Sequence, residues 1–275
     1  MNKVAAIQMA SGPNISGNLT EIARLITECV QAGAQLVLLP ENFAHMGESE
    51  ADKLELAEAQ GHGPIQDFLA EQAAKHGIWL IGGTIPLKAE DNNHVKAACL
   101  VFNDQGEQVT RYDKIHLFDV ELKDTDEKYI ESETISAGNE LAWCDSPFGR
   151  IGLSVCYDVR FPELFRELMV HEIDIFMVPS AFTATTGQAH WETLIKARAI
   201  ENLCYVVAAN QGGYHVNGRE THGDSMVVDP WGNILDRLPR GSGYVLADID
   251  LAQLKRVRET FPALAHRRIN CGKSK

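Results

Sequence analysis

Long apolar runs are missing from this sequence of 275 residues. Apolar stretches such as 36–40 and 173–179 are far shorter than the ~18 residues that a membrane-spanning segment requires. The apolar N-terminus is interrupted by Gln8, so it predicts a first β-strand rather than a signal peptide. We therefore expect no membrane among the partners of this protein.

Positive charge is also scarce. Lys and Arg together number 25 against 38 Asp and Glu, which leaves a formal net charge of −13 at pH 7. A field of that sign repels the phosphates of nucleic acids and the surfaces of anionic membranes. These two classes of partner are excluded by charge, although a local basic patch would still suit a small anionic substrate.

Paired cysteines and the common cofactor motifs are absent too. The six cysteines are scattered and form no CxxC pair, which predicts reduced thiols and a cytoplasmic location. The sequence has no HExxH, no GxxxxGK and no dinucleotide-binding fingerprint. We expect neither a metal ion nor an organic cofactor.

Apolar strands and amphipathic helices alternate along the chain, with no linker, repeat or low-complexity tract. We expect one α/β domain over residues 1–275, with a helix that begins at an Asn18 cap and helices over 64–76 and 190–202. The mixture of α/β units and antiparallel hairpins favours layered sheets covered by helices over a barrel. The stretch 114–138 is too long for an ordinary connector, which predicts a functional or disordered segment.

Three chemically useful side chains follow predicted strands: Glu41, Lys114 and Cys156. Ligands of open α/β sheets bind beyond the carboxyl ends of strands, so these side chains are candidates to meet in one crevice. There the thiol would attack a carbonyl, the carboxylate would take its proton, and the ammonium would lower the thiol pKa and hold the oxyanion. Each residue also has an ordinary alternative, as a buried core cysteine, a solvated glutamate or a surface lysine.

The sequence around these residues resembles that of the nitrilase superfamily of carbon–nitrogen hydrolases. The motifs are LPENF at 39–43, RYDKIHLFD at 111–119 and GLSVCYDVRFPEL at 152–164. The resemblance implies an α-β-β-α sandwich that pairs with a second subunit into a four-layer homodimer or a larger homo-oligomer. It also implies a Glu41–Lys114–Cys156 triad and a fourth active-site residue, Glu131, which the ESET wording favours over Glu133.

The mechanism implied by the resemblance runs through a thioester. Glu41 accepts the proton of Cys156, the sulfur attacks an amide carbonyl, and Lys114 and the backbone N–H of Tyr157 hold the oxyanion. Water activated by Glu41 then hydrolyses the thioester. A Cys–His arrangement is the rival within enzymes, with His116 or His222 as the base, although a packing role suits His116 better.

Three further residues are candidate substrate contacts. Arg160 follows Cys156 by four positions and would grip a substrate carboxylate, unless it pairs with Glu163 or Asp158. Phe182 and Thr186 follow the strand over 173–178 and would supply an apolar wall and a hydroxyl donor; ordinary loop packing is the alternative.

Only the resemblance of two sequence segments indicates the substrate. Residues 179–213 and 223–233 resemble the deaminated glutathione amidase branch, which releases 2-oxoglutarate and cysteinylglycine. The expected partner is thus a small amide that carries a carboxylate. Two alternatives stay open: the ω-amidase branch, which acts on 2-oxoglutaramate, and a catalytically silent binding protein of the same fold.

Overall fold

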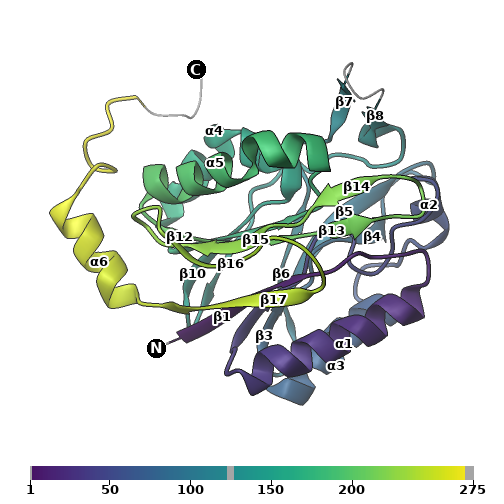
Figure 1. Ribbon diagram of the computed structural model, residues 1–275, viewed down its shortest axis with the longest axis horizontal. Coiled ribbons are helices and arrows are strands. Elements are labelled where there is room, and N and C mark those ends of the chain that lie inside the picture. Colours follow the sequence, from purple (N-terminus) through teal and green to yellow (C-terminus); the bar gives the residue numbers. More distant parts are fainter. Residues whose placement is uncertain (1, 123–126, 270–275) are drawn as a thin grey trace.

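Two β-sheets form the centre of the protein, and helices cover their outer faces (Figure 1). The computed structural model describes residues 2–122 and 127–269. The first sheet has seven strands: β1 (Asn2–Gln8), β2 (Leu36–Leu38), β3 (Trp79–Ile81), β4 (Ile85–Lys88), β5 (Val95–Phe102), β6 (Gln108–Asp113) and β17 (Gly243–Ile249). Its order is β17-β1-β2-β3-β5-β4, with β6 also paired to β5.

The second sheet has the order β16-β15-β12-β11-β10-β9. Its strands are β9 (Trp143–Ser146), β10 (Gly149–Leu153), β11 (Ile175–Ser180), β12 (Tyr205–Asn210), β15 (Ser225–Val228) and β16 (Ile234–Leu238). Two small hairpins accompany the sheets: β7 (Asp119–Leu122) with β8 (Glu127–Ile130), and β13 (Gly212–Tyr214) with β14 (Glu220–His222).

The described residues form six α-helices and three short 3₁₀ helices. The α-helices are α1 (Ile15–Gln31), α2 (Asp52–Glu55), α3 (Pro64–His76), α4 (Pro162–Leu168), α5 (Ala184–Asn202) and α6 (Leu251–Thr260). The 3₁₀ helices are η1 (Glu131–Glu133), η2 (Cys156–Arg160) and η3 (Met169–His171). In Figure 1, α1 and α3 lie against the outer face of one sheet, and α4 and α5 against that of the other.

The alternation of side chains along the strands explains the layers. Successive residues of a strand point to opposite faces, so Val4 and Ala6 of β1 pack in the apolar cluster shared with the second sheet. Ala5 and Ile7 of the same strand belong to the cluster beneath α1 and α3. Both faces of the sheet are therefore buried, and the predicted α-β-β-α sandwich is confirmed.

Two predicted helix starts are wrong. Helix α1 begins at Ile15, because the side chain of Asn14 caps it by accepting a hydrogen bond from the N–H of Gly17. Asn18 is instead buried, and its side-chain amide bonds the backbone of Gly12 and Ala44. The helix expected over 190–202 begins at Ala184, six residues earlier, because Thr183 caps it.

The long polar stretch after Lys114 is built around the β7–β8 hairpin and η1. The described residues of this stretch are 114–122 and 127–138. Within the described ranges, no helix combines the length and the apolar character needed to cross a bilayer.

Candidate active site

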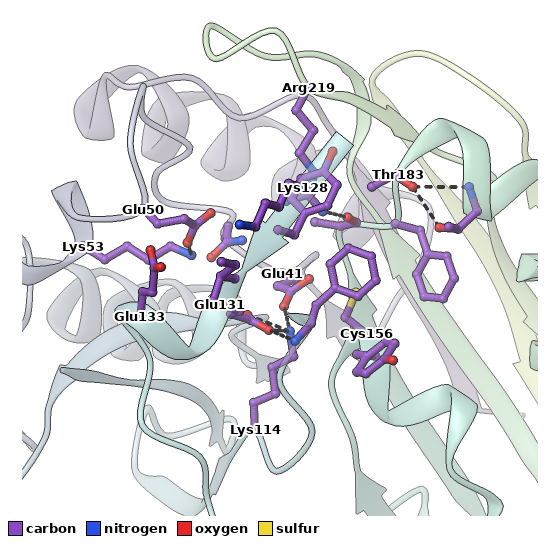
Figure 2. A pocket seen from close by; sticks show the side chains of 18 of the residues that line it. Glu41, Glu50, Lys53, Lys114, Lys128, Glu131, Glu133, Cys156, Thr183 and Arg219 are labelled. Carbon is purple, nitrogen blue, oxygen red and sulfur yellow. Dashed lines mark hydrogen bonds and ion pairs between the residues drawn. The ribbon is translucent and has the colours of Figure 1, made fainter. Parts of the chain in front are cut away.

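One cavity of about 410 Å³ gathers every site residue that the sequence predicted (Figure 2). Three loops that follow strands deliver the candidate triad: Glu41 comes after β2, Lys114 directly after β6, and Cys156 after β10. The other predicted residues on its wall are Glu131, Tyr157, Arg160, Phe182 and Thr186. The structure thus brings together side chains that lie as far apart in sequence as 41 and 186.

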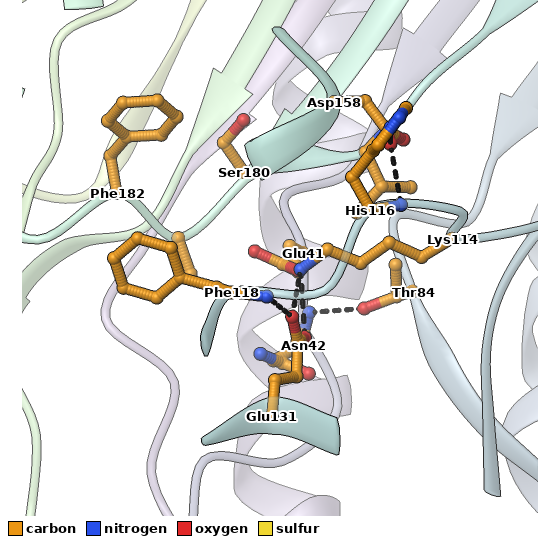
Figure 3. A network of polar contacts seen from close by, with 12 residues as sticks. Glu41, Asn42, Thr84, Lys114, His116, Phe118, Glu131, Asp158, Ser180 and Phe182 are labelled. Carbon is orange, nitrogen blue, oxygen red and sulfur yellow. Dashed lines mark hydrogen bonds and ion pairs between the residues drawn. The ribbon is translucent and has the colours of Figure 1, made fainter. Parts of the chain in front are cut away.

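Lys114 lies at the centre of an ionic cluster. Its Nζ is 2.8 Å from Oε1 of Glu41 and 2.8 Å from each carboxylate oxygen of Glu131 (Figure 3). The N–H of Phe118 donates to Glu131 at 2.7 Å and fixes that carboxylate. Glu133 also lines the cavity, but its carboxylate has no bond to Lys114 among the described contacts. The geometry therefore favours Glu131 over Glu133 as the partner of Lys114.

Burial makes this cluster electrostatically strong. Lys114 is only 2% exposed and Glu41 only 3%. Burial opposes the charge on Lys114, but the carboxylates of Glu131 and Glu41 outweigh it and hold its pKa well above the usual value. Burial likewise opposes the charge on Glu41, and the Lys114 ammonium more than compensates, so the pKa of Glu41 is lowered. The Lys114 ammonium thus lies between the carboxyl groups of Glu41 and Glu131.

Cys156 occupies a strained backbone conformation at the first position of η2. Its φ angle is +48°, in the left-handed region that non-glycine residues rarely adopt. Asp158 holds the turn, because its Oδ2 accepts the N–H of Val155 at 2.8 Å and its own N–H donates to the carbonyl of Val155. The strain is maintained by buried hydrogen bonds and orients the thiol into the cavity.

Lys114 acts on the thiol in the expected direction, since its ammonium lowers the pKa of Cys156, but other effects are larger. Burial and the nearby Glu41 carboxylate raise the pKa of Cys156, and they outweigh the opposing effects of the Lys114 ammonium and the N–H of Ala181. The resting sulfur therefore carries its proton. The carboxylate of Glu41, which raises the pKa of the thiol and lines the same cavity, is in place to accept that proton.

The loop that carries Glu41 is fixed by close packing. A Cβ at Gly83 would lie 2.0 Å from the carbonyl oxygen of Pro40, and its φ is +48°, so only glycine fits there. The hydroxyl of Thr84 accepts the N–H of Asn42 at 2.9 Å, and Gln211 donates to the carbonyl of Glu41 at 2.9 Å. These contacts hold the Glu41 carboxylate near the sulfur and the ammonium.

The histidines considered for a Cys–His arrangement lie elsewhere. His116 stacks on Phe161, with ring centroids 3.7 Å apart, and its Nδ1 is 2.7 Å from Asp158. His222 lies 3.7 Å from Asp224. Neither ring lines the cavity formed by the described residues. His116 thus has the packing and hydrogen-bonding role that suits it, and the position beside the sulfur belongs to Glu41.

Arg160 has neither of the ion pairs considered for it. Its guanidinium lies 5.2 Å above the Phe182 ring and 5.8 Å from that of Tyr157, and Nη1 is 3.2 Å from Nδ1 of His190. Across the described ranges, no carboxylate forms an ion pair with it. Burial lowers the pKa of this guanidinium. A cation held by aromatic rings in a cavity is available to bind an anion.

The start of α5 contributes hydroxyl groups to the same wall. Thr183 caps the helix, and its Oγ1 lies 2.8 Å from that of Thr186. Phe182, directly before the cap, is 4% exposed and packs 4.9 Å from the ring of Trp191. Phe182 and Thr186 both line the cavity, and their predicted roles as apolar wall and hydroxyl donor to a substrate stay predictions.

Sequence reasoning missed several residues of the cavity wall. They carry charge or polar groups: Asn42 lies within the LPENF motif and Thr183 within the segment 179–213, whereas no recognised motif contains Glu50, Lys53, Lys128 and Arg219. The sequence NGRET around Arg219 does not indicate a site residue, because only the folded structure brings the β13–β14 hairpin to the cavity. Among the described residues, no cluster of three or more His, Cys, Asp or Glu side chains is arranged to hold a metal ion.

Known proteins resemble this chain over most of its length. The pattern of the carbon-nitrogen hydrolase family matches residues 3–259. A protein of Yersinia enterocolitica named deaminated glutathione amidase is 42% identical over 266 residues, which cover 96% of this chain and 92% of that protein. One of the same name from Synechocystis sp. (strain PCC 6803 / GT-S) is 44% identical over 267 residues, which cover 96% and 97%.

The fold has a solved counterpart in the NitFhit protein of C. elegans. Its crystal structure matches with a TM-score of 0.90 and 39% identity over 97% of this chain. The chain spans 65% of that longer protein. The family pattern over most of the sequence and relatives above 40% identity lead to one conclusion: the chain belongs to the carbon-nitrogen hydrolase family.

Proposed function

We propose that this protein is an amidase that hydrolyses the amide bond of deaminated glutathione to 2-oxoglutarate and cysteinylglycine. The observation that carries the proposal is the buried Lys114 ammonium, bound by Glu41 and Glu131 in the cavity that also holds the Cys156 thiol. Relatives that share more than 40% identity with the chain bear the name of this activity.

The first half of the reaction forms a thioester. The Cys156 sulfur attacks the amide carbonyl as its proton passes to Glu41, and Lys114 stabilises the oxyanion. The backbone N–H of Tyr157, next to the nucleophile, is the second proposed donor to that oxyanion. The C–N bond then breaks, the nitrogen takes the proton from Glu41, and cysteinylglycine leaves.

The second half releases the acid. Glu41, again a carboxylate, accepts a proton from water as the water oxygen attacks the thioester carbonyl, and the sulfur leaves and is reprotonated. Glu131 acts through Lys114: with both oxygens at 2.8 Å, it fixes the ammonium where the oxyanion develops. Arg160 binds the carboxylate of the 2-oxo acid, and Phe182 and Thr186 line the same wall.

The test is a comparison of kcat/KM for two synthetic amides, deaminated glutathione and 2-oxoglutaramate. The proposal expects the higher value for deaminated glutathione. A clear preference for 2-oxoglutaramate would assign the chain to ω-amidase chemistry, and turnover of neither amide would favour a catalytically silent binding protein.

The thioester is tested by mass spectrometry of acid-quenched protein. We expect an added mass of the 2-oxoglutaryl group on Cys156 in wild type and none in Cys156→Ala, which should lose turnover and keep its fold. Cys29→Ala is the matched control, since Cys29 is buried in the cluster under α1 and contributes nothing to the cavity wall. Assembly into a homodimer and a cytoplasmic location stay predictions.

A further inference from the structure

Two guanidinium groups on the cavity wall have no carboxylate partner within the described part of the chain. One is Arg160; the other is Arg219, just before β14. Arg219 lies 5.0 Å above the ring of Tyr129, and its Nη2 donates to the carbonyl of Ala181. Its Nε is buried and has no hydrogen-bond partner among the described atoms. A buried N–H donor without a hydrogen-bond partner is costly unless a ligand accepts from it.

Ala181 connects Arg219 to the reacting atoms. Its N–H lowers the pKa of the Cys156 thiol, and its carbonyl accepts a hydrogen bond from Arg219. Ala181 therefore lies between the guanidinium of Arg219 and the sulfur of Cys156. In Figure 2, Arg219 reaches into the cavity from the side opposite Lys114.

The two arginines serve different parts of the cavity. Arg160 shares the η2 turn with Cys156, and its electrostatic neighbours are Cys156 and Tyr157. Those of Arg219 are Glu41 and Glu50. Lys53 is already paired with Glu50, which leaves Arg219 and Lys128 as the cations on that side that form no ion pair with a described residue.

The proposed substrate has a carboxylate at each end, since its products are 2-oxoglutarate and cysteinylglycine. The oxo-acid carboxylate lies about 5 Å from the scissile bond, and the glycine carboxylate about 7 Å away on the other side, given ~3.5 Å per extended residue. Building on the proposed function, we propose that Arg219 binds the terminal carboxylate of the leaving dipeptide, while Arg160 holds the acyl half. Arg219 is thus the residue that selects a dipeptide leaving group over ammonia.

The experiment pairs a change in the protein with a change in the substrate. Deaminated glutathione, its analogue with a C-terminal carboxamide, and 2-oxoglutaramate are assayed with wild type and Arg219→Gln. We expect Arg219→Gln to lower kcat/KM for the carboxylate substrate by roughly 10- to 100-fold, mainly through KM, because charge-assisted bidentate bonds are lost. The carboxamide analogue and 2-oxoglutaramate should change less than about threefold.

Arg240→Gln makes the same charge change at an exposed position outside the cavity and should leave all three values unchanged. An equal loss on all three substrates would show that Arg219 only supports the Ala181 loop, and would overturn the inference. A selective loss in Lys128→Gln instead would move the role to Lys128. If wild type hydrolyses deaminated glutathione but does not distinguish it from the carboxamide, the inference fails and the proposed function stands; if wild type hydrolyses neither, both fail.

Discussion

Asp158 is a buried carboxylate that holds the η2 turn, which begins at Cys156. It is fully buried and accepts four hydrogen bonds: from the Tyr112 hydroxyl at 2.7 Å, the Val155 N–H at 2.8 Å, and the His116 N–H and Nδ1 at 3.1 and 2.7 Å. Asp158→Asn changes one oxygen to an NH₂ group without changing the volume. The Tyr112 hydroxyl and the His116 ring can adapt by turning or by changing tautomer, but a backbone N–H cannot.

Each orientation of the new amide therefore leaves one backbone N–H unpaired, either that of Val155 or that of His116. An unsatisfied buried donor costs about 1–3 kcal/mol, and the lost charge on the remaining bonds adds about 1 kcal/mol. We expect Asp158→Asn to lower the free energy of unfolding by about 2–4 kcal/mol, and to lower kcat because Val155 precedes the strained Cys156.

The measurement is urea unfolding followed by circular dichroism, with kcat measured in parallel. Tyr112→Phe is the matched control: it removes the hydroxyl that donates to Asp158 and accepts the N–H of Ile115 at 3.3 Å, leaves the Val155 bond in place, and should cost about 1–2 kcal/mol. An Asp158→Asn midpoint that corresponds to a loss below about 0.5 kcal/mol, the range of ordinary surface changes, would refute the reasoning.

Three further outcomes are expected. Glu131→Gln should lower kcat by roughly 10²-fold, because Lys114 loses one of its two carboxylates, whereas Glu133→Gln should cost far less; similar losses would contradict the choice between them. The pKa of Glu41 is lowered in the folded protein, so its ionised carboxylate stabilises the fold above the usual carboxyl pKa of about 4.3. This stabilisation is lost as pH falls through the lowered pKa. Urea unfolding from about pH 5 to 3 should therefore show a steeper loss of stability in wild type than in Glu41→Gln. Gly83→Ala should lower the thermal midpoint and kcat/KM together, since its Cβ meets the Pro40 carbonyl; an unchanged kcat/KM would disprove the role given to that loop.

The sequence predicted the elements and the triad well where local signals were strong. The strands before Glu41 and Cys156 are short apolar runs, and helix α3 begins at Pro64 and ends before Gly77, as its pattern indicates. It failed at the start of α1, since two asparagines, 14 and 18, are both plausible caps and only the tertiary contacts of Asn18 decide between them. The sequence also could not predict that the pKa of Cys156 is raised, because burial is a property of the assembled site.

The order of apolar segments and three motifs determined, by themselves, the layered α/β architecture and the residue types available for amide chemistry. Only the tertiary structure decided which acid binds Lys114, which cations stay unpaired, and that Arg219 reaches the site. The physical reason is that hydrophobic periodicity involves residues that are close in sequence. Desolvation and ion pairing instead depend on side chains that meet only when distant segments pack.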